Sequence, residues 1–572
     1  MLLLLCQFSL APLALAQTPP DAGRVLKETQ RTEPGVKPSL KKPDIRFPEE
    51  RAAPADSGAK VKVNCFRISG ATLIPVDELL AEISGSTGAE LTLTELRRLA
   101  QRLSDAYRRK GLFARALVPQ QPVAGGVVEI TVIEGKLAAV DVDVLPGTRL
   151  SETRARQTIT RQQAVGEPLR PDAVQTGMRN LNDLPGIAAT GVLQPGEASG
   201  EVKLGVRVES TPLFTATASV DNYGLKATGQ VRGVGQVQLN SPFSYGDQLY
   251  ALGLVTERSN YLRAGYNLPL GYSGLRAGLT AAQLNYRLTG LFGGFEGTAT
   301  TFGASLTMPL RRTGSSNLFG SLAAEHKHFV NDGAGGINLS NKTSKTLTLE
   351  IRGDFTDNFY GTARNAFSVA VVGGELDLGR NPGNLTADQA GPRTQGSFTK
   401  LPWNFQRVQT LAPNWELAAT ANGQFAGTNL DAYEKMSLGG PSAVRAYPSG
   451  EALGDEGWLA SIEIRRAFSA ELQASAFIDA GHISQLHSTF PGFNAGNPNR
   501  PNSYTLYGAG IDLPRQHGDG HPARAHSLAH RRQCRRGQRH HQPERRQSQR
   551  KPDHQPRHHQ LEHLQHRLAG HG

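Results

Sequence analysis

The sequence predicts two kinds of structure in tandem: small α+β modules with the order β-α-α-β-β, followed by an all-β transmembrane barrel. Two observations lead to this prediction. Between residues 61 and 211, short strand patterns and amphipathic helical patterns follow each other in the same order twice. Beyond Pro212 the helical period disappears, and apolar and polar residues alternate along segments of about ten residues that end in Gly, Asn, Pro or Asp turns.

The first 60 residues predict an export signal and a tether. Residues 1–16 are apolar and end in Ala14-Leu15-Ala16, so we expect a signal peptide cleaved after Ala16, although a positive n-region is lacking. Within residues 17–60 we expect a short polar helix over Asp21–Arg31 and then a Pro-rich linker. The linker prolines favour an extended chain without regular structure, and they are Pro34, Pro38, Pro43, Pro48 and Pro54.

Residues 61–136 and 137–211 are the two predicted modules. In the first we expect a strand, two helices and two strands, over Val63–Ile68, Val76–Ile83, Leu93 to Gly111, Phe113–Val118 and Val127–Ile133. In the second we expect the same order, over Val140–Val144, Ser151–Arg161, Pro171–Leu181, Ile187–Leu193 and Val202–Val208. The repeat is one of element order and not of residue identity.

Residues 212–513 carry the strand pattern, with about fourteen segments between Phe214 and Leu513. No internal stretch reaches the ~18 uninterrupted apolar residues of a spanning helix, so membrane crossing requires strands. A soluble β-sandwich is the alternative. Long strands in meander order behind a signal peptide and two small modules favour the transmembrane barrel.

The formal net charge of +12 is concentrated at the C-terminus. Residues 514–572 contain 13 Lys+Arg against four acidic residues and 12 of the 16 His, but no Phe, Trp, Tyr, Val or Ile. The preceding residues carry 49 basic against 46 acidic side chains and are nearly neutral. Export leaves Cys65 and Cys534 in the mature chain, and two lone cysteines predict no disulfide framework.

Three interpretations of the 514–572 tail compete. A basic nucleic-acid-binding tail lacks stacking aromatics, and we expect no nucleic-acid partner for an exported protein. A metal-binding His tract is a second interpretation, and His559-Gln-Leu-Glu562-His563 matches a zinc-peptidase pattern, but this match is expected by chance in a His-rich segment. We favour the third, a frameshift near Leu513, because GC-rich DNA read out of frame yields Arg, His, Gln and Pro. We expect no metal and no cofactor.

Two short motifs lie in the barrel region. Val444-Arg445-Ala446-Tyr447 stands inside a Gly/Pro-rich stretch, and Phe477-Ile478-Asp479-Ala480-Gly481 stands in a strand pattern. Strand alternation places Asp479 on the same face as Phe477. We expect that face to line the lumen, because a carboxylate on the lipid face is costly.

The arrangement and both motifs resemble the two-partner secretion transporters, the haemolysin secretion/activation family of ShlB, FhaC and HecB type. The resemblance covers Met1 to about Leu513. It implies two POTRA modules, a sixteen-stranded outer-membrane barrel and a plug helix near Asp21–Arg31 that sits in the pore at rest. It also implies that the Val-Arg-Gly-Tyr motif lies at the tip of a loop folded into the pore. Here Ala446 replaces the family's Gly, which puts backbone freedom at that position in question.

The resemblance implies a pore-loop lock in which the loop arginine meets the strand aspartate. Its residues here are Arg445, Tyr447, Phe477, Asp479 and Gly481. The structural alternative for Arg445 is an ordinary solvated loop arginine. An Arg–carboxylate pair would be bidentate and would orient the loop.

The implied function is export of a large secreted exoprotein from the periplasm to the cell surface, not catalysis. The chain contains no Gly-x-x-x-x-Gly-Lys-Ser/Thr loop for ATP, so client binding and folding would supply the energy. The strands Phe113–Val118 and Val202–Val208 are candidate edges for client docking by strand addition. Outer-membrane lipid and the barrel-assembly machinery are the other expected partners. A barrel insertase and an outer-membrane enzyme are alternative functions.

Overall fold

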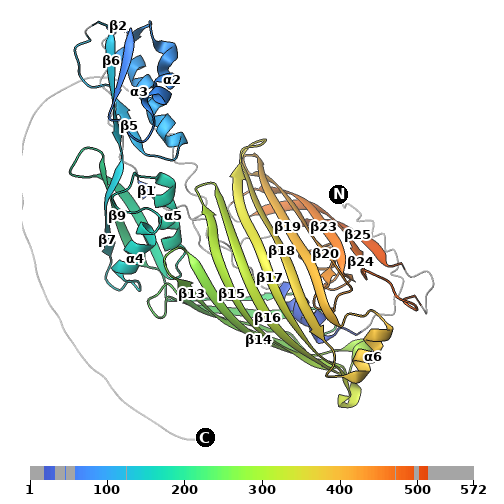
Figure 1. The fold of residues 1–572 in the computed structure, drawn as a ribbon. Helices are drawn as coiled ribbons and strands as arrows, with labels where there is room; N and C mark the ends of the chain where they lie inside the picture. The colour runs from blue at the N-terminus through green and yellow to red at the C-terminus, as the bar shows by residue number, and fades with distance from the viewer. Residues whose placement is uncertain are drawn as a thin grey trace, which may run out of the picture. The chain divides into compact units, whose positions relative to one another are not determined.

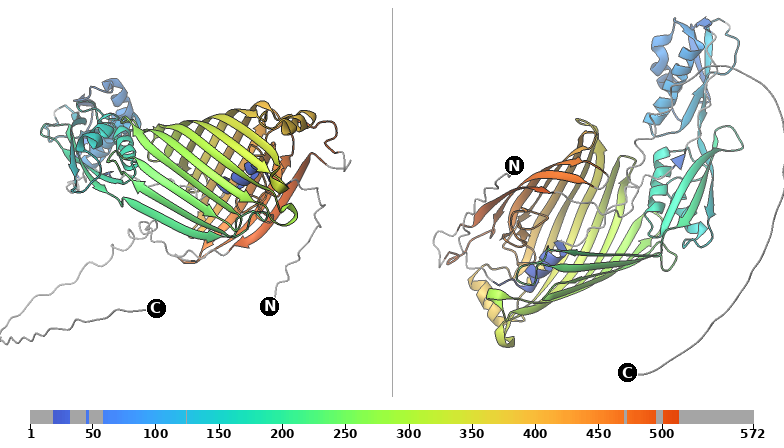
Figure 2. Two further views of the ribbon diagram at one scale, coloured as in Figure 1. Left: turned by 90° about the horizontal axis from the view of Figure 1, so that it is seen from below. Right: turned by 180° about the vertical axis from the view of Figure 1, so that it is seen from behind.

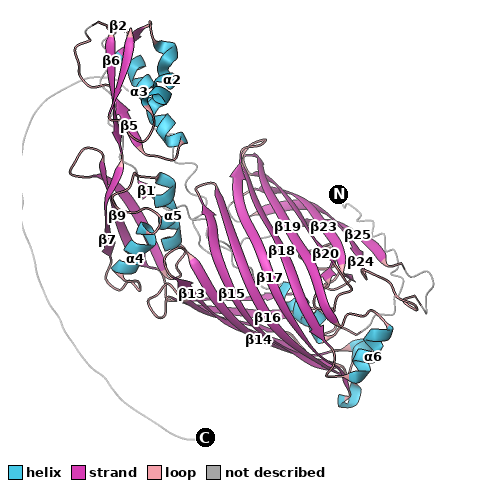
Figure 3. Ribbon diagram, viewed as in Figure 1, coloured by secondary structure: helices cyan, strands magenta, loops and turns pink. Residues whose placement is uncertain are grey.

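A computed structural model describes residues 19–31, 58–123, 125–469, 472–494 and 501–512, together with the backbone of residues 45–46. The predicted signal peptide, most of the linker, Cys534 and the 514–572 tail lie outside the described residues. No helix in the described part of the chain is long and apolar enough to cross a membrane. Helices are confined to few places, and most described residues form strands (Figures 1 and 3).

The first small module has the predicted β-α-α-β-β order. Its elements are β3 (Cys65–Ser69), α2 (Val76–Ile83), α3 (Leu93–Arg109), β5 (Ala114–Leu117) and β6 (Val127–Glu134). A short pair of strands, β2 (Lys60–Lys62) and β4 (Glu90–Thr92), and a 3₁₀ turn, η1 (Ser84–Ser86), were not predicted. Helix α3 begins at a reciprocal cap, in which the Thr92 hydroxyl accepts from the Glu95 N–H and the Glu95 carboxylate accepts from the Thr92 N–H.

The second module repeats this order with its own hydrophobic core. Its elements are β7 (Lys136–Val144), α4 (Glu152–Thr160), α5 (Pro171–Asn182), β8 (Ile187–Pro195) and β9 (Glu201–Ser210). The Ser151 hydroxyl caps α4, and Pro171 opens α5, as predicted. The linker supplies a further strand, β1 (Ile45–Arg46), which pairs in parallel with β8. The expectation that the linker prolines prevent regular structure was therefore wrong at Ile45 and Arg46. Neither residue is a proline, so both can form backbone hydrogen bonds in a strand.

Strand pairing corrects one of the two candidate docking edges. In the first module the sheet order is β3-β6-β5, so β5, which contains most of Phe113–Val118, is an edge strand. In the second module the order is β1-β8-β9-β7, so β9 is paired on both sides. Because β9 has no free backbone edge, Val202–Val208 cannot accept an added strand. The edge equivalent to β5 is β8, and β1 pairs with it.

In the described part of the chain a sheet of fourteen strands follows, and every neighbouring pair is antiparallel. The strands are β10 (Phe214–Asp221), β11 (Arg232–Asn240), β12 (Gln248–Val255), β13 (Ser259–Leu270), β14 (Leu275–Arg287), β15 (Glu296–Arg312), β16 (Ser316–Asp332), β17 (Asn338–Asp357), β18 (Ala363–Asp377), β19 (Gly396–Ala412), β20 (Trp415–Ala426), β23 (Glu456–Ala467), β24 (Gln473–Ser484) and β25 (Ser503–Asp512). The predicted strand count and fold class are confirmed. Among the described residues, β10 and β25 are the two ends of this sheet.

Alternation along these strands separates an apolar outer face from a polar inner face. Leu262, Ile462 and Ile478 are all more than half exposed, as lipid-facing side chains are in an isolated chain. On the opposite face Lys327 and Asp479 are almost fully buried. Aromatic side chains lie at the turns, as with Phe243, whose ring meets Tyr266 edge-on. Such aromatic positions are typical of the membrane boundary.

Helix α1 (Ala22–Arg31) lies within the curve of the large sheet (Figure 2). Its apolar side chains pack on the inner face of the wall, where Val25 and Leu26 join a buried cluster with Leu284 and Phe329. The helix predicted over Asp21–Arg31 is therefore present. The remaining short helices are α6 (Pro382–Ala390), η2 (Gly290–Phe292) and η3 (Ala334–Gly336).

Candidate functional site: the inward loop and the plug helix

The long connection between β20 and β23, residues 427–455, folds back against the inner wall; we call it the inward loop. It contains a small hairpin, β21 (Met436–Ser437) paired with β22 (Leu453–Gly454). Its apolar residues Leu438 and Val444 are fully buried and cluster with Leu459 and Ile483 of the wall. A loop that buries apolar side chains in this way is held in one conformation.

Arg445 at the tip of the inward loop binds Asp479 of β24 in a bidentate pair. The Arg445 Nε–Asp479 Oδ2 distance is 3.0 Å and the Nη2–Oδ1 distance is 2.9 Å. The Arg445 backbone N–H also donates to Asp479 Oδ2, at 3.0 Å. Asp479 has no solvent exposure. Planar charge-assisted contacts of this kind fix both the position and the direction of the arginine.

Strand β23 supplies two further partners to Arg445 that the sequence did not indicate. Nη1 lies 2.8 Å from Glu463 Oε2, and Nη2 donates to Ser461 Oγ at 3.0 Å. The guanidinium carbon also lies 3.3 Å from the centroid of the Phe477 ring. Partial burial alone would lower the pKa of Arg445, but the Asp479 and Glu463 carboxylates raise it above its usual value. We call these five residues the Arg445 cluster.

The other predicted motif residues surround this cluster without joining its ion pairs. Tyr447 packs on the buried apolar side of the inward loop. A Cβ on Gly481 would lie 2.8 Å from Leu438 Cδ2, so a larger residue here would require the Leu438 side chain of the inward loop to shift. Ala446 is not among the residues with positive φ, so alanine fits its backbone without strain.

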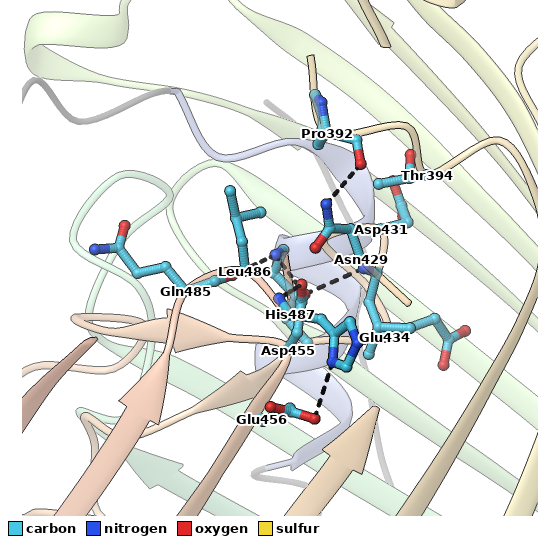
Figure 4. Close-up of polar contacts among 12 residues, drawn as sticks. Pro392, Thr394, Asn429, Asp431, Glu434, Asp455, Glu456, Gln485, Leu486 and His487 are labelled. Carbon is cyan, nitrogen blue, oxygen red and sulfur yellow. Dashed lines mark hydrogen bonds and ion pairs between the residues drawn. The ribbon is translucent and has the colours of Figure 1, made fainter. Parts of the chain in front are cut away.

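The base of the inward loop is held separately, around the fully buried Asp455 (Figure 4). Its carboxylate accepts from the Leu430 N–H at 3.2 Å and the His487 N–H at 2.9 Å, and it lies 2.5 Å from Lys435 Nζ. Leu430 lies near the start of the loop and His487 follows β24. Asp455 therefore joins both ends of the inward loop to the neighbouring connection.

Helix α1 contacts both the wall and the inward loop. Lys342 of β17 lies 2.6 Å from Asp21 Oδ2, immediately before α1, and 2.5 Å from Asp431 Oδ2 in the inward loop. At the other end, Arg31 Nη2 donates to the Gly439 carbonyl at 2.7 Å. Arg24 donates to the Gly450 carbonyl. The helix and the loop thus share a set of polar contacts inside the sheet.

Comparison with known proteins identifies the family. The model of the haemolysin secretion/activation protein family ShlB/FhaC/HecB matches residues 200–496, more than half of the chain. The chain belongs to this family. A model of the ShlB-type POTRA domain matches residues 61–135. The chain is accordingly an outer-membrane transporter with an N-terminal periplasmic region, and it translocates a partner exoprotein.

Individual relatives agree with this assignment. The haem/hemopexin transporter protein HuxB of Haemophilus influenzae strain 86-028NP is 27% identical over 500 residues, which cover 83% of this chain and 85% of the relative. The outer membrane transporter CdiB of Dickeya dadantii is 23% identical over 75% of this chain and 78% of its own length. The structure of CdiB from Escherichia coli superposes with a TM-score of 0.62 at 22% identity, over 82% of this chain and 87% of that chain.

Proposed function

We propose that the Arg445 cluster keeps the inward loop in the lumen during transport, while helix α1 leaves the lumen to open the pore. The observation that supports this division is the bidentate Arg445–Asp479 pair, which joins the loop tip to a wall strand. Removing Arg445 would leave the fully buried Asp479 carboxylate without a cation, which costs several kcal/mol, and removing Asp479 would leave Arg445 with Glu463 as its one carboxylate partner. The loop would then lose its fixed position.

The test is export of the cognate exoprotein by Arg445→Ala and Asp479→Ala variants. Both are expected to abolish secretion while the protein remains in the outer-membrane fraction at the parental level. Normal export by Asp479→Ala would overturn the assignment. Outer-membrane fractionation separates a loss of transport from a loss of insertion.

We further propose that the client is captured in the periplasm by strand addition at β5 and β8. Strand β5 is the edge of its sheet and pairs with β6 alone, and its Ala116 N–H donates to Ser104 Oγ at 2.9 Å, so an added client strand would compete with this one side-chain bond. Strand β8 pairs with β9 and with the linker strand β1. A client strand would have to displace β1 from β8, and this would free the linker that carries α1. The name of the haem/hemopexin transporter relative suggests a haem-related exoprotein as the client class.

We infer that residues 514–572 are read out of frame and that the native continuation supplies two more strands. A sheet edge in lipid leaves unpaired backbone groups, which is costly. Two added strands would join β25 to β10 and complete a sixteen-stranded barrel, inserted by the barrel-assembly machinery into outer-membrane lipid. Resequencing across the Leu513 codon tests this inference. An alternative frame without two amphipathic strands would overturn it.

A further inference from the structure

A cavity of about 400 Å³ lies between helix α1 and the wall. It is lined by side chains of α1, of the inward loop and of strands β16 to β19. Its basic lining residues are Lys27, Arg31, Lys327 and Lys400, and its acidic lining residues are Glu325 and Glu434. Because α1 contributes part of the lining, the cavity exists only while the helix is in the lumen.

The acidic residues of this cavity are already engaged by the wall. Glu434 lies 2.7 Å from Lys400 and 3.6 Å from Lys327. Lys327 also lies 2.9 Å from Glu325. The two wall lysines and the two carboxylates therefore balance each other without any contribution from α1.

Lys27 of α1 brings an additional positive charge into this balanced group. Arg31 is neutralised on its own helix by Glu28 and donates to loop carbonyls. Within the described part of the chain, the Lys27 ammonium has no carboxylate partner, and its nearest identified contact is the Tyr433 ring, 5.8 Å away at its centroid. The Lys327 ammonium lies 4.7 Å from the same centroid, so the two cations share one aromatic ring.

The carboxylates nearest Lys27 in charge, Glu434 and Glu28, are already paired with Lys400 and Arg31, so among the described residues the Lys27 ammonium has no hydrogen-bond acceptor of its own. Burial, together with the Lys400 and Lys327 ammoniums, lowers the pKa of Lys27 to about 7. An anion bound in the cavity would stabilise the charged form of Lys27 and so oppose this lowering of its pKa. An oxyanion suits the lining better than a monatomic ion, because it can accept from Lys27 and from the wall lysines at the same time.

We propose that the cavity binds a small inorganic oxyanion, such as phosphate or sulfate, that bridges Lys27 of the plug helix to Lys327 and Lys400 of the wall. Bound there, the oxyanion stabilises the plugged state and lowers the frequency of spontaneous opening. The inference rests on the proposal that α1 is the plug. It adds a ligand that links the opening of the pore to the ionic composition around it.

The test is pore opening by the purified full-length protein in planar lipid bilayers, in chloride and in phosphate at constant ionic strength and constant pH. We expect millimolar phosphate to lower the opening frequency several-fold, and sulfate to act similarly. Lys27→Gln is expected to remove the effect, whereas Lys27→Arg retains it. Lys203→Gln, at a partly exposed lysine of the second module outside the cavity, is the control and should respond like the parent.

Two outcomes would overturn the anion site: an opening frequency in the parent that does not depend on phosphate, or an equal phosphate response in Lys27→Gln. In either case normal secretion by the parent would leave the proposed export function intact. A secretion defect in Asp479→Ala concerns the lock alone, so the two proposals fail separately.

Discussion

The inward loop and helix α1 occupy the same lumen but are held by different kinds of contact. The Arg445 side chain makes charged contacts with two carboxylates on adjacent strands, one of them fully buried. The helix is attached through apolar packing on the wall, through hydrogen bonds of Ala22 to Asn331 and of Arg31 to a loop carbonyl, and through Lys342, which pairs with Asp21 just before the helix and with Asp431. This difference supports the proposal that the loop tip remains in the lumen while the helix is released.

The remaining counter-ions show which of the two departures, that of α1 or that of the loop tip, costs more free energy. If α1 leaves, Lys342 keeps Asp431 as a partner, so no wall cation is left buried and unpaired. If the loop tip leaves, Asp479 loses the guanidinium that neutralises it. Breaking a buried pair so that one charge remains alone typically costs about 3–5 kcal/mol. Helix release avoids this cost at the wall, and loop release does not.

The largest expected effect comes from weakening the loop tip while keeping its charge. Arg445→Lys retains the cation but cannot form the two parallel contacts to Asp479. We expect secretion of the exoprotein to fall more than about tenfold, measured against a parent with the same C-terminal sequence. Arg465→Lys, which alters the neighbour of Glu463 outside the cluster, is the matched control and should secrete nearly normally. Equal secretion by both variants would remove the distinction between the two regions.

The next effect is expected at the shared lysine. Lys342→Met removes the cation between Asp21 and Asp431, so two partly buried carboxylates face each other without compensation. Their repulsion should favour departure of α1, and we expect spontaneous pore opening in bilayers to rise about tenfold, equivalent to about 1.4 kcal/mol. Lys345→Met, on the same strand but the opposite face, is the control. An unchanged opening frequency would show that Lys342 does not hold the plug.

A smaller effect is expected from pH in buffers without oxyanions. In the plugged state the pKa of Lys27 is about 7, against 10.5 for a free lysine. Between these values the plugged state binds fewer protons than the open state, so the plug is held more firmly as pH rises through this window. Opening frequency should therefore fall several-fold from pH 6.5 to pH 9 (~1 kcal/mol), and the response should disappear in Lys27→Gln. A response that persists in Lys27→Gln would assign the titration to another group.

The smallest effect is expected at Ala446. Its backbone lies outside the positive-φ region, so glycine offers no conformational advantage there. Ala446→Gly should reduce the free energy that holds the loop tip against the wall by about 0.4–1 kcal/mol, because a glycine gives the chain more conformational freedom when the tip is not bound. Secretion should stay within about twofold of the parent, which the same export assay measures. A large gain in secretion would mean that alanine strains this position.

Local patterns in the sequence were sufficient for most of the fold. Helix α2 (Val76–Ile83) has the predicted bounds, and the strand count follows from alternation and turns. The error at Val202–Val208 has a clear cause, because chain order does not reveal spatial order. Strand β9 lies between β8 and β7 only through a parallel pairing with β7 that local periodicity cannot indicate.

The site was predicted only where a motif marked it. The two motifs predicted a contact between Arg445 and Asp479, and the structure places these side chains in contact. Glu463 and Ser461 lie on the inner face of β23 at the level of the loop tip, and Ser461 is the register partner of Asp479. Pairing β23 with β24 by their alternation could have found them. Lys342 could not be found in this way, because its partner Asp21 is 321 residues away in sequence.

The most direct test of the account is secretion with α1 covalently joined to the inward loop. A Cβ on Gly23 would lie 3.1 Å from the Tyr433 Cβ, so a small outward shift would bring two cysteines here to the ~3.5–4.5 Å that a disulfide spans between Cβ atoms. Gly23→Cys with Tyr433→Cys, in a background without the native cysteines of the mature chain (Cys65→Ser and Cys534→Ser), should abolish secretion when oxidised and restore it on reduction. Gly23→Cys alone should secrete under both conditions. Full secretion by the oxidised double variant would show that the helix does not have to leave the lumen, which would contradict the account.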